Sequence, residues 1–83
     1  MSEQRLRAAI LEMSRDRGPS SSICPSDAAR AVGGDDWRDL MDGARDAARE
    51  LARAGEVEIT QKGKAVDPDA EWRGPIRIRI TKR

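Results

Sequence analysis

The spacing of apolar residues changes once along this 83-residue chain, and the change limits the folds it can adopt. Up to Gly55 the apolar residues recur every three or four positions, as in amphipathic helices. Beyond it they alternate with polar residues over 57–60 and again over 76–81, which is typical of half-buried strands. Because two such strands are not stable alone in water, they must pack on the helices. The sequence therefore predicts an α+β fold.

Three helices are expected before this change, over residues 2–17, 25–32 and 35–54. Each is followed by residues that commonly end helices, namely Gly18-Pro19, Gly33-Gly34 and Gly55. Asp35 and Asp36 are good N-cap residues for the third helix, which we expect to be the longest element. Between the first two helices, Ile23 can contribute a short extended piece.

The order of these elements is that of a winged helix-turn-helix. The alternating segments would form its wing, joined over residues 60–75 by a connection that is long for a hairpin, with a turn at Asp67-Pro68. We therefore expect residues 1–83 to form a single domain of winged helix-turn-helix type. It would contain three helices and a C-terminal antiparallel β-hairpin wing.

A domain of this size must rely on one small core. The helical faces and the inward positions of the strands predict its members. They are Leu6, Ile10, Met13, Val32, Trp37, Leu40, Met41, Leu51, Val57, Ile59, Ile76 and Ile78.

The composition argues against several classes of function. With no histidine and one cysteine, the chain lacks the usual zinc ligands, an internal disulfide and a Cys-His nucleophile. We expect a protein that is not an enzyme and that uses no cofactor and no metal. Its N-terminus is polar, and no apolar run approaches the roughly 20 residues that span a bilayer. We therefore expect a cytoplasmic protein without a membrane segment.

Charge is balanced overall but not along the chain. Sixteen basic and fifteen acidic residues leave a net charge of +1. Residues 35–54 carry a net charge of −2 and residues 55–83 a net charge of +2, so the wing is the basic part. We expect nucleic-acid contacts from Arg38, Arg45, Lys62, Lys64, Arg77 and Arg79. Arg73, Lys82 and Arg83 could extend this edge, while cross-strand ion pairs with Glu56 and Glu58 would neutralise part of it.

Two further residues have alternative interpretations. Trp72, in the long connection, can pack against the domain or anchor a protein interface. Cys24 precedes the second helix, where packing or capping is favoured over a reactive thiol. On the third helix, ion pairs between Asp39, Asp42 or Asp46 and neighbouring arginines are the favoured reading over an acid–base or magnesium site.

Several short motifs together resemble a bacterial family known as domain of unknown function three-two-five-three. They are Ile23-Cys24-Pro25-Ser26, Ala29-Arg30, Trp37-Arg38, Leu40-Met41, Thr60-Gln61-Lys62-Gly63-Lys64, Asp67-Pro68 and Gly74-Pro75-Ile76-Arg77-Ile78-Arg79. The resemblance covers nearly the whole chain and implies a winged-helix-like fold. It implies no activity, cofactor or functional residue.

Two functional hypotheses follow, both for a binding module. In the first, the wing contacts DNA phosphates weakly, in a transcription-related role. In the second, the chain is a protein-interaction winged helix that binds no nucleic acid and uses Trp72 and the mixed-charge third helix. The acidic start of that helix favours the second, and neither hypothesis predicts an oligomeric state.

Overall fold

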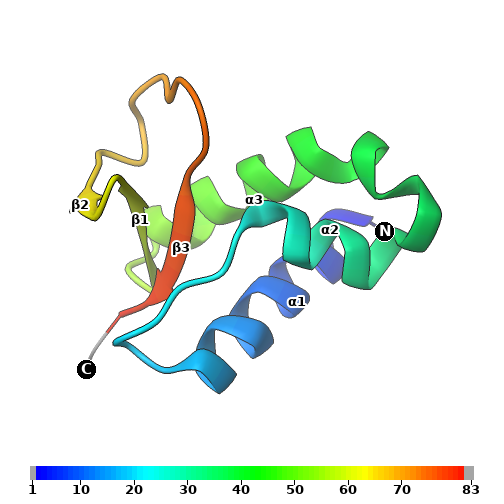
Figure 1. The fold of residues 1–83 in the computed structure, drawn as a ribbon, viewed down its shortest axis with the longest axis horizontal. Coiled ribbons are helices and arrows are strands. Elements are labelled where there is room, and N and C mark those ends of the chain that lie inside the picture. Colours follow the sequence, from blue (N-terminus) through cyan, green and yellow to red (C-terminus); the bar gives the residue numbers. More distant parts are fainter. Residues whose placement is uncertain (1, 82–83) are drawn as a thin grey trace.

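Helices occupy the first two-thirds of the chain and a small antiparallel sheet the last third, in a computed structural model that describes residues 2–81 (Figure 1). The helical elements are α1 (Ser2–Arg17), α2 (Pro25–Gly33), the 3-10 helix η1 (Gly34–Leu40) and α3 (Met41–Arg53). The strands are β1 (Val57–Gln61), β2 (Lys64–Ala65) and β3 (Arg77–Ile80). The predicted α+β class is confirmed.

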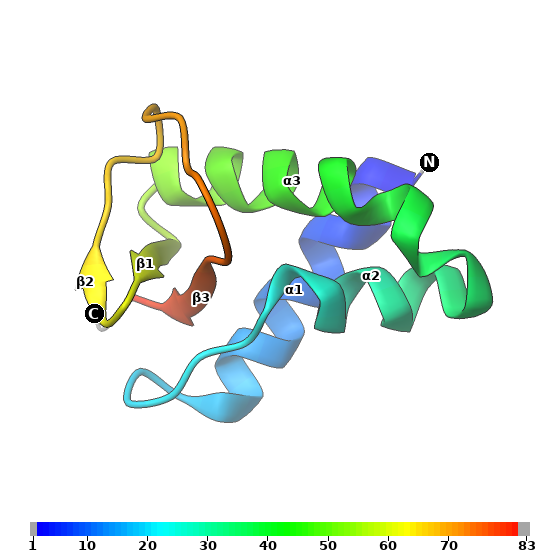
Figure 2. The same ribbon diagram turned by 45° about the horizontal axis from the view of Figure 1, so that its top comes forward.

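The expected turn between the second and third helices is wrong. Residues 25–53 are helical throughout, and η1 joins α2 to α3 with a kink at Asp36. Asp35 and Asp36 lie inside η1, so neither caps α3, and α1 is longer than α3, with 16 residues against 13. Leu40 explains the local geometry, because a Cβ at Gly33 would lie 2.6 Å from its Cδ1 atom. Glycine thus lets η1 fold back onto α2, and α3 then runs back across it (Figure 2).

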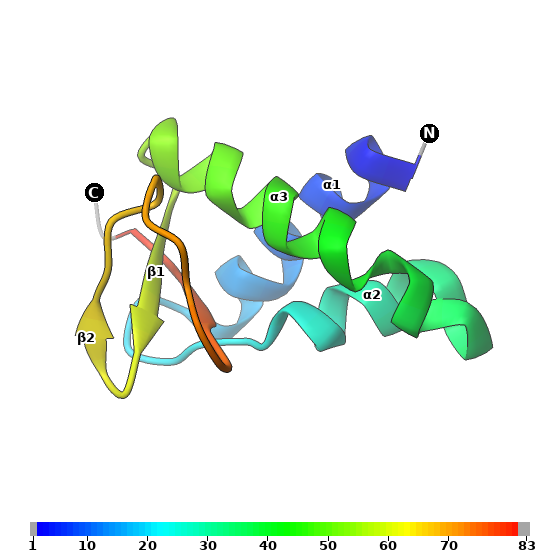
Figure 3. The ribbon, with the colours of Figure 1, turned by 90° about the horizontal axis from the view of Figure 1, so that it is seen from above.

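β1 is the central strand of a sheet with the order β2-β1-β3, and both pairings are antiparallel. Ile23 adds to the other side of β3, because its amide and carbonyl both bond to those of Ile78 at 2.8 Å. The extended piece predicted there is confirmed. In Figure 3 the sheet lies at one end of the molecule, with the end of α2 and η1 at the other.

The long connection between β1 and β3 contains a hairpin that the sequence analysis missed. Thr60 pairs with Ala65 and Gln61 with Lys64, which leaves a two-residue turn at Lys62-Gly63. Both turn residues have positive φ, 52° and 81°, as two-residue turns of type I′ require. The sequence has Lys62 where such turns usually have asparagine, so it lacks the Asn-Gly signal that would have predicted the turn. Lysine itself rarely adopts this conformation. We call residues 62–76 the β1–β3 connection.

Gly63→Ala should destabilise this hairpin through the backbone alone. No atom lies within 4 Å of the position of a Cβ at Gly63, so crowding is not a factor. The left-handed conformation of an alanine costs about 1–2 kcal/mol, and we expect a urea unfolding free energy lowered by that amount. Lys64→Ala, one residue along in the strand, should leave it nearly unchanged, and equal unfolding curves for the two variants would contradict the proposed cause.

The predicted core is confirmed for seven of its twelve members and wrong for the other five. Seven predicted members are buried: Leu6, Ile10, Leu51, Val57, Ile59, Ile76 and Ile78. Five others only pack against it from partly exposed positions: Met13, Val32, Trp37, Leu40 and Met41. Seven further members of the hydrophobic core were absent from the prediction: Ile23, Ala28, Ala29, Ala44, Ala47, Ala48 and Trp72. Trp37 is not buried because it lies on η1, none of whose residues is buried, and not on α3, which contributes three of the buried alanines.

Candidate functional site

The six cations predicted to contact nucleic acid do not form one surface. Arg38 lies on η1, where its guanidinium carbon is 5.0 Å from the centre of the Trp37 ring. Arg30 of α2 lies 4.5 Å from the same ring. Half-buried Trp37 is therefore covered by two arginines. In Figure 2 η1, which carries Arg38, lies at the end of the molecule away from the sheet.

Arg45 holds the β1–β3 connection in place. Its Nη2 group donates to the carbonyls of Trp72 and Gly74, each at 3.4 Å. Four residues along α3, Arg49 donates to the carbonyls of Pro68 and Ala70, at 2.8 and 3.1 Å. Arg53 completes the row with an ion pair to Asp69 at 2.5 Å. We call Arg45, Arg49 and Arg53 the arginine ladder.

The arginine ladder was not predicted as such, although its i, i+4, i+8 spacing is visible in the sequence. We expected α3 arginines to pair with Asp39, Asp42 or Asp46, and within residues 2–81 no such ion pair is present. This expectation is therefore wrong. Arg45 and Arg49 donate instead to backbone carbonyls of the β1–β3 connection, and Arg53 pairs with Asp69 there. Helical spacing alone does not reveal these contacts, because they reach far along the chain.

Trp72 belongs to the core, which was the first of its two interpretations. Its side chain is 8% exposed, and its Nε1–H donates to the carbonyl of Asp67 at 2.9 Å. Arg49 covers its ring at 4.3 Å. The predicted turn at Asp67 is present, since the Ala70 amide bonds to the Asp67 carbonyl at 3.1 Å. With so little of its ring exposed, Trp72 offers a protein partner almost no contact area.

The two arginines of β3 differ in whether their charge is neutralised. Arg79 forms an ion pair with Glu58, its cross-strand partner on β1, as the alternating pattern predicts. Arg77 instead turns toward the segment before α2. It donates from Nε to Ser22 Oγ at 3.0 Å, from Nη2 to the Ser22 carbonyl at 2.9 Å and from Nη1 to Cys24 Sγ at 2.7 Å. None of these acceptors is a carboxylate, so the charge of Arg77 is not cancelled.

Four cations of the sheet end thus have no carboxylate partner among residues 2–81: Lys62, Lys64, Arg73 and Arg77. We call them the basic group, and all four are exposed. Sequence analysis placed Arg73 only at the margin of this set. Lys82 and Arg83 lie outside the described residues.

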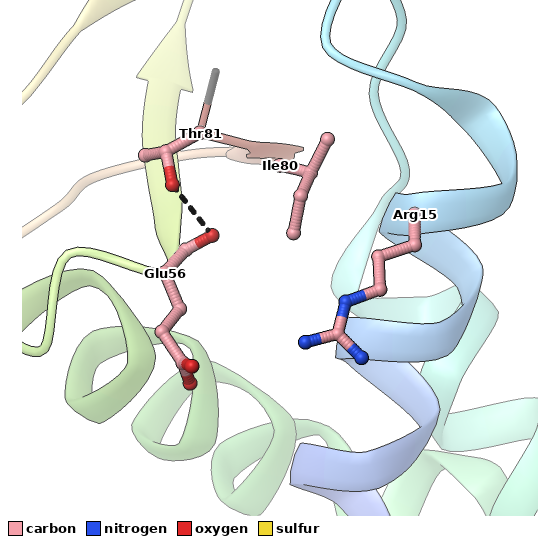
Figure 4. A pocket seen from close by; sticks show the side chains of 4 residues that line it. All are labelled: Arg15, Glu56, Ile80 and Thr81. Atoms are coloured by element: carbon pink, nitrogen blue, oxygen red, sulfur yellow. Dashed lines mark hydrogen bonds between the residues drawn. The ribbon is translucent and has the colours of Figure 1, made fainter. Parts of the chain in front are cut away.

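Three members of the basic group line a hollow of about 430 Å³, which we call the basic hollow. Its lining consists of Gln61, Lys62, Arg73, Pro75 and Arg77, with no carboxylate. A neighbouring hollow at the other end of β3 is different, because Arg15 and Glu56 approach it from opposite sides (Figure 4). Hollows beside Glu58 and beside Glu3 also include carboxylates in their linings. An anion would meet the least repulsion in the basic hollow.

The opposite end of the molecule is acidic. Five exposed aspartates, which we call the acidic group, lie on η1 and the first half of α3: Asp35, Asp36, Asp39, Asp42 and Asp46. In Figure 2 η1 and β2 lie at opposite ends of the molecule, so the acidic and basic groups are well separated. The chain is therefore nearly neutral overall, but its negative and positive charges are concentrated at opposite ends of the molecule.

Two structural features are absent from residues 2–81, a cluster of metal ligands and a membrane-spanning helix. Within residues 2–81 no three side chains of the His, Cys, Asp and Glu types are grouped as a metal site would require. None of the helices described has both the length and the apolar character needed to cross a bilayer.

Comparison with known proteins identifies a family but no activity. The model of a family described as "Protein of unknown function (DUF3253)" matches residues 3–81, which is nearly the whole chain. No curated protein matches it. The match confirms the resemblance that the sequence motifs indicated, and the functional argument must therefore come from the geometry.

Proposed function

We propose that this chain, which belongs to the DUF3253 family, is a winged-helix domain that binds duplex DNA through the phosphates rather than the bases. Support for the winged-helix assignment comes from the order of elements. A helix, the extended residue Ile23, three further helical elements and the antiparallel strands β1 and β3 follow one another, and Ile23 bonds to β3. In this assignment α3 is the third helix and the β1–β3 connection is the wing.

The observation that carries the proposal is the unpaired charge of the basic group. Lys62 lies in the turn of the β1–β2 hairpin and Lys64 directly follows that turn, and both side chains are exposed. Phosphate contacts by lysine and arginine supply most of the affinity of sequence-independent DNA binding. Of the other predicted cations, Arg79 is neutralised by Glu58, and Arg45 keeps its charge but is half-buried against backbone carbonyls. The proposed contact surface is therefore the basic group, on the wing and at the start of β3.

Helix α3 is a poor candidate for insertion into the major groove. In helix-turn-helix proteins the groove is entered by the first part of the recognition helix. Here Asp42 and Asp46 are exposed in the first half of α3 and Asp39 is exposed just before it, and phosphates on both sides of the groove would repel them. The proposed binding therefore positions the domain on the backbone without reading the sequence, and it involves no catalysis.

Lys62→Ala/Lys64→Ala should weaken binding to a random-sequence duplex and reduce its dependence on salt. Each lost phosphate contact should flatten the slope of log affinity against log salt concentration by about 0.9. Fluorescence anisotropy of a labelled duplex across a salt series measures this slope. Since exposed lysines contribute little to folding, the free energy of unfolding should change little.

A matched control is Arg5→Ala/Arg17→Ala, which removes two exposed cations from α1. Its net charge equals that of the lysine variant, so a purely global charge effect would change both slopes equally. We expect the control to retain nearly the parental slope. Equal slopes for the two double variants, or no binding by the parent even at low salt, would contradict the proposal.

The acidic group of η1 and α3 favours a second candidate function, binding to a basic protein surface. Like-charge repulsion keeps such a surface away from nucleic acid and leaves it free for a partner. Trp72 has no part in this version, because it is buried. Absence of DNA binding, together with a partner whose binding is weakened by Asp39→Asn/Asp42→Asn, would favour this candidate.

A further inference from the structure

The walls of the basic hollow are fixed by contacts that leave its cations unneutralised. Gln61 Nε2 donates to the carbonyls of Arg73 and Pro75, at 2.7 and 3.4 Å, and so ties the end of β1 to the segment that enters β3. Arg45 bonds to the carbonyl of Gly74 from the other side. Backbone from 73 to 75 is thus held on both sides, while the Arg73 side chain makes no hydrogen bond or ion pair among residues 2–81. Its cation remains available to a ligand.

Arg77 is also held in place with donor capacity remaining. A guanidinium has five N–H groups in a planar fork. Its bonds to Ser22 and Cys24 use one N–H on each of Nε, Nη1 and Nη2, which leaves one on Nη1 and one on Nη2. A cation that is already immobilised loses little further conformational entropy when it binds an anion.

The chemistry of the lining indicates the charge and shape of the anion. Three cations around one opening suit a group with several acceptor oxygens and more than one negative charge. Arginine forks bind phosphate oxygens in pairs, and lysine acts as a further point charge. A phosphate monoester carries about −1.5 to −2 at neutral pH, whereas the phosphodiester within a nucleic-acid strand carries a single charge.

We propose that the basic hollow binds one phosphate monoester group. The same chemistry occurs at a phosphorylated end of a nucleic-acid strand and on free phosphorylated compounds. The strand end is the source that rests on the proposed function, because Lys64 would then contact the adjoining backbone from outside the hollow. The site itself depends only on the lining residues.

The site is tested first with inorganic phosphate alone. Addition of phosphate to the ¹⁵N-labelled full chain should shift the backbone amide signals of Gln61, Lys62, Arg73 and Arg77, with sodium chloride of equal ionic strength as the reference. Arg73→Ala should weaken the apparent affinity for phosphate about tenfold, because it removes a charged hydrogen-bonding group. The fold should persist, since Gln61 binds the carbonyl of Arg73 and not its side chain.

Lys64→Ala is the matched control, because Lys64 lies on the same hairpin but does not line the hollow. It should leave the phosphate affinity nearly unchanged. If the four signals respond no more to phosphate than to chloride, the proposal is wrong. It is equally wrong if Arg73→Ala and Lys64→Ala reduce the affinity to the same extent.

The source of the phosphate is identified with two duplexes of one sequence, one with 5′-phosphate ends and one with 5′-hydroxyl ends. A strand-end site predicts tighter binding of the phosphorylated duplex, with the difference lost in Arg73→Ala and retained in Lys64→Ala. Equal binding of both duplexes, with phosphate still bound, supports the site and assigns it to free phosphorylated compounds. Phosphate binding without binding of either duplex supports the site and contradicts the proposed function, so the two failures are distinct.

Discussion

Trp72→Ala is expected to lower the free energy of unfolding by about 3–5 kcal/mol, enough to unfold much of a domain this small. The indole is 8% exposed and packs within the main hydrophobic cluster. Its removal leaves a cavity and also deprives the Asp67 carbonyl of one of its two N–H donors and Arg49 of its aromatic contact. Urea denaturation followed by far-ultraviolet circular dichroism measures the change.

Trp37→Ala provides the comparison, because it deletes the same side chain from a half-buried position on η1. Loss of its cation–π contacts with Arg30 and Arg38 and of partial burial should cost about 1–2 kcal/mol. A greater loss of stability in Trp37→Ala than in Trp72→Ala would reverse the roles that the structure gives the two residues. A Trp72→Ala chain too unstable to study can be replaced by Trp72→Phe, which should still be the less stable of the pair when compared with Trp37→Phe.

Local pattern was sufficient to predict most of the elements. Apolar periodicity predicted α1 and the alternating segments that form β1 and β3, and Gly18-Pro19 predicted the end of α1. Ile23 was identified as extended because it stands alone between helix-ending residues and a proline. These features depend on nearest neighbours in the chain, so a single sequence contains them.

Features that depend on distant contacts were not predictable in the same way. Trp37 lies on the apolar face of a helical pattern and Trp72 in a polar segment, yet Trp72 is the buried one. The reason is that the β1–β3 connection folds back onto α3, which supplies Arg49 and a place in the core for the indole. Local periodicity could not predict the burial of Trp72, because the β1–β3 connection is held in place by α3, about twenty residues earlier in the chain.

The same reasoning applies to the candidate site. Counting charges identified residues 55–83 as the basic region, and the alternating pattern identified Arg79 with Glu58 as a pair. Which cations keep their charge could not be counted, because Arg45 and Arg77 are both held by backbone or side-chain atoms far away in sequence. Of these two arginines, only Arg77 lines the basic hollow together with Lys62 and Arg73.

Arg49→Met should cost about 2–3 kcal/mol of unfolding free energy, a large effect for a charged residue on a helix surface. Methionine keeps the apolar stem but removes the bonds to the Pro68 and Ala70 carbonyls and the cation over Trp72. Hydrogen exchange of the Trp72 indole Nε1–H, which bonds to the Asp67 carbonyl, should also become faster because the connection is less firmly held.

Arg53→Met is the matched control, one helical turn further along the arginine ladder. Its ion pair with Asp69 joins two side chains that are 54% and 64% exposed, and such pairs contribute roughly 0–1 kcal/mol. The two variants lose the same charge from the same helix, so they differ mainly in what the guanidinium contacts. If both lose equal stability, or if exchange of the Trp72 indole proton is unchanged in Arg49→Met, the ladder does not hold the β1–β3 connection. A larger effect at Arg49 would identify the middle of α3 as the support of the β1–β3 connection, which is a different role from contacting bases in a groove.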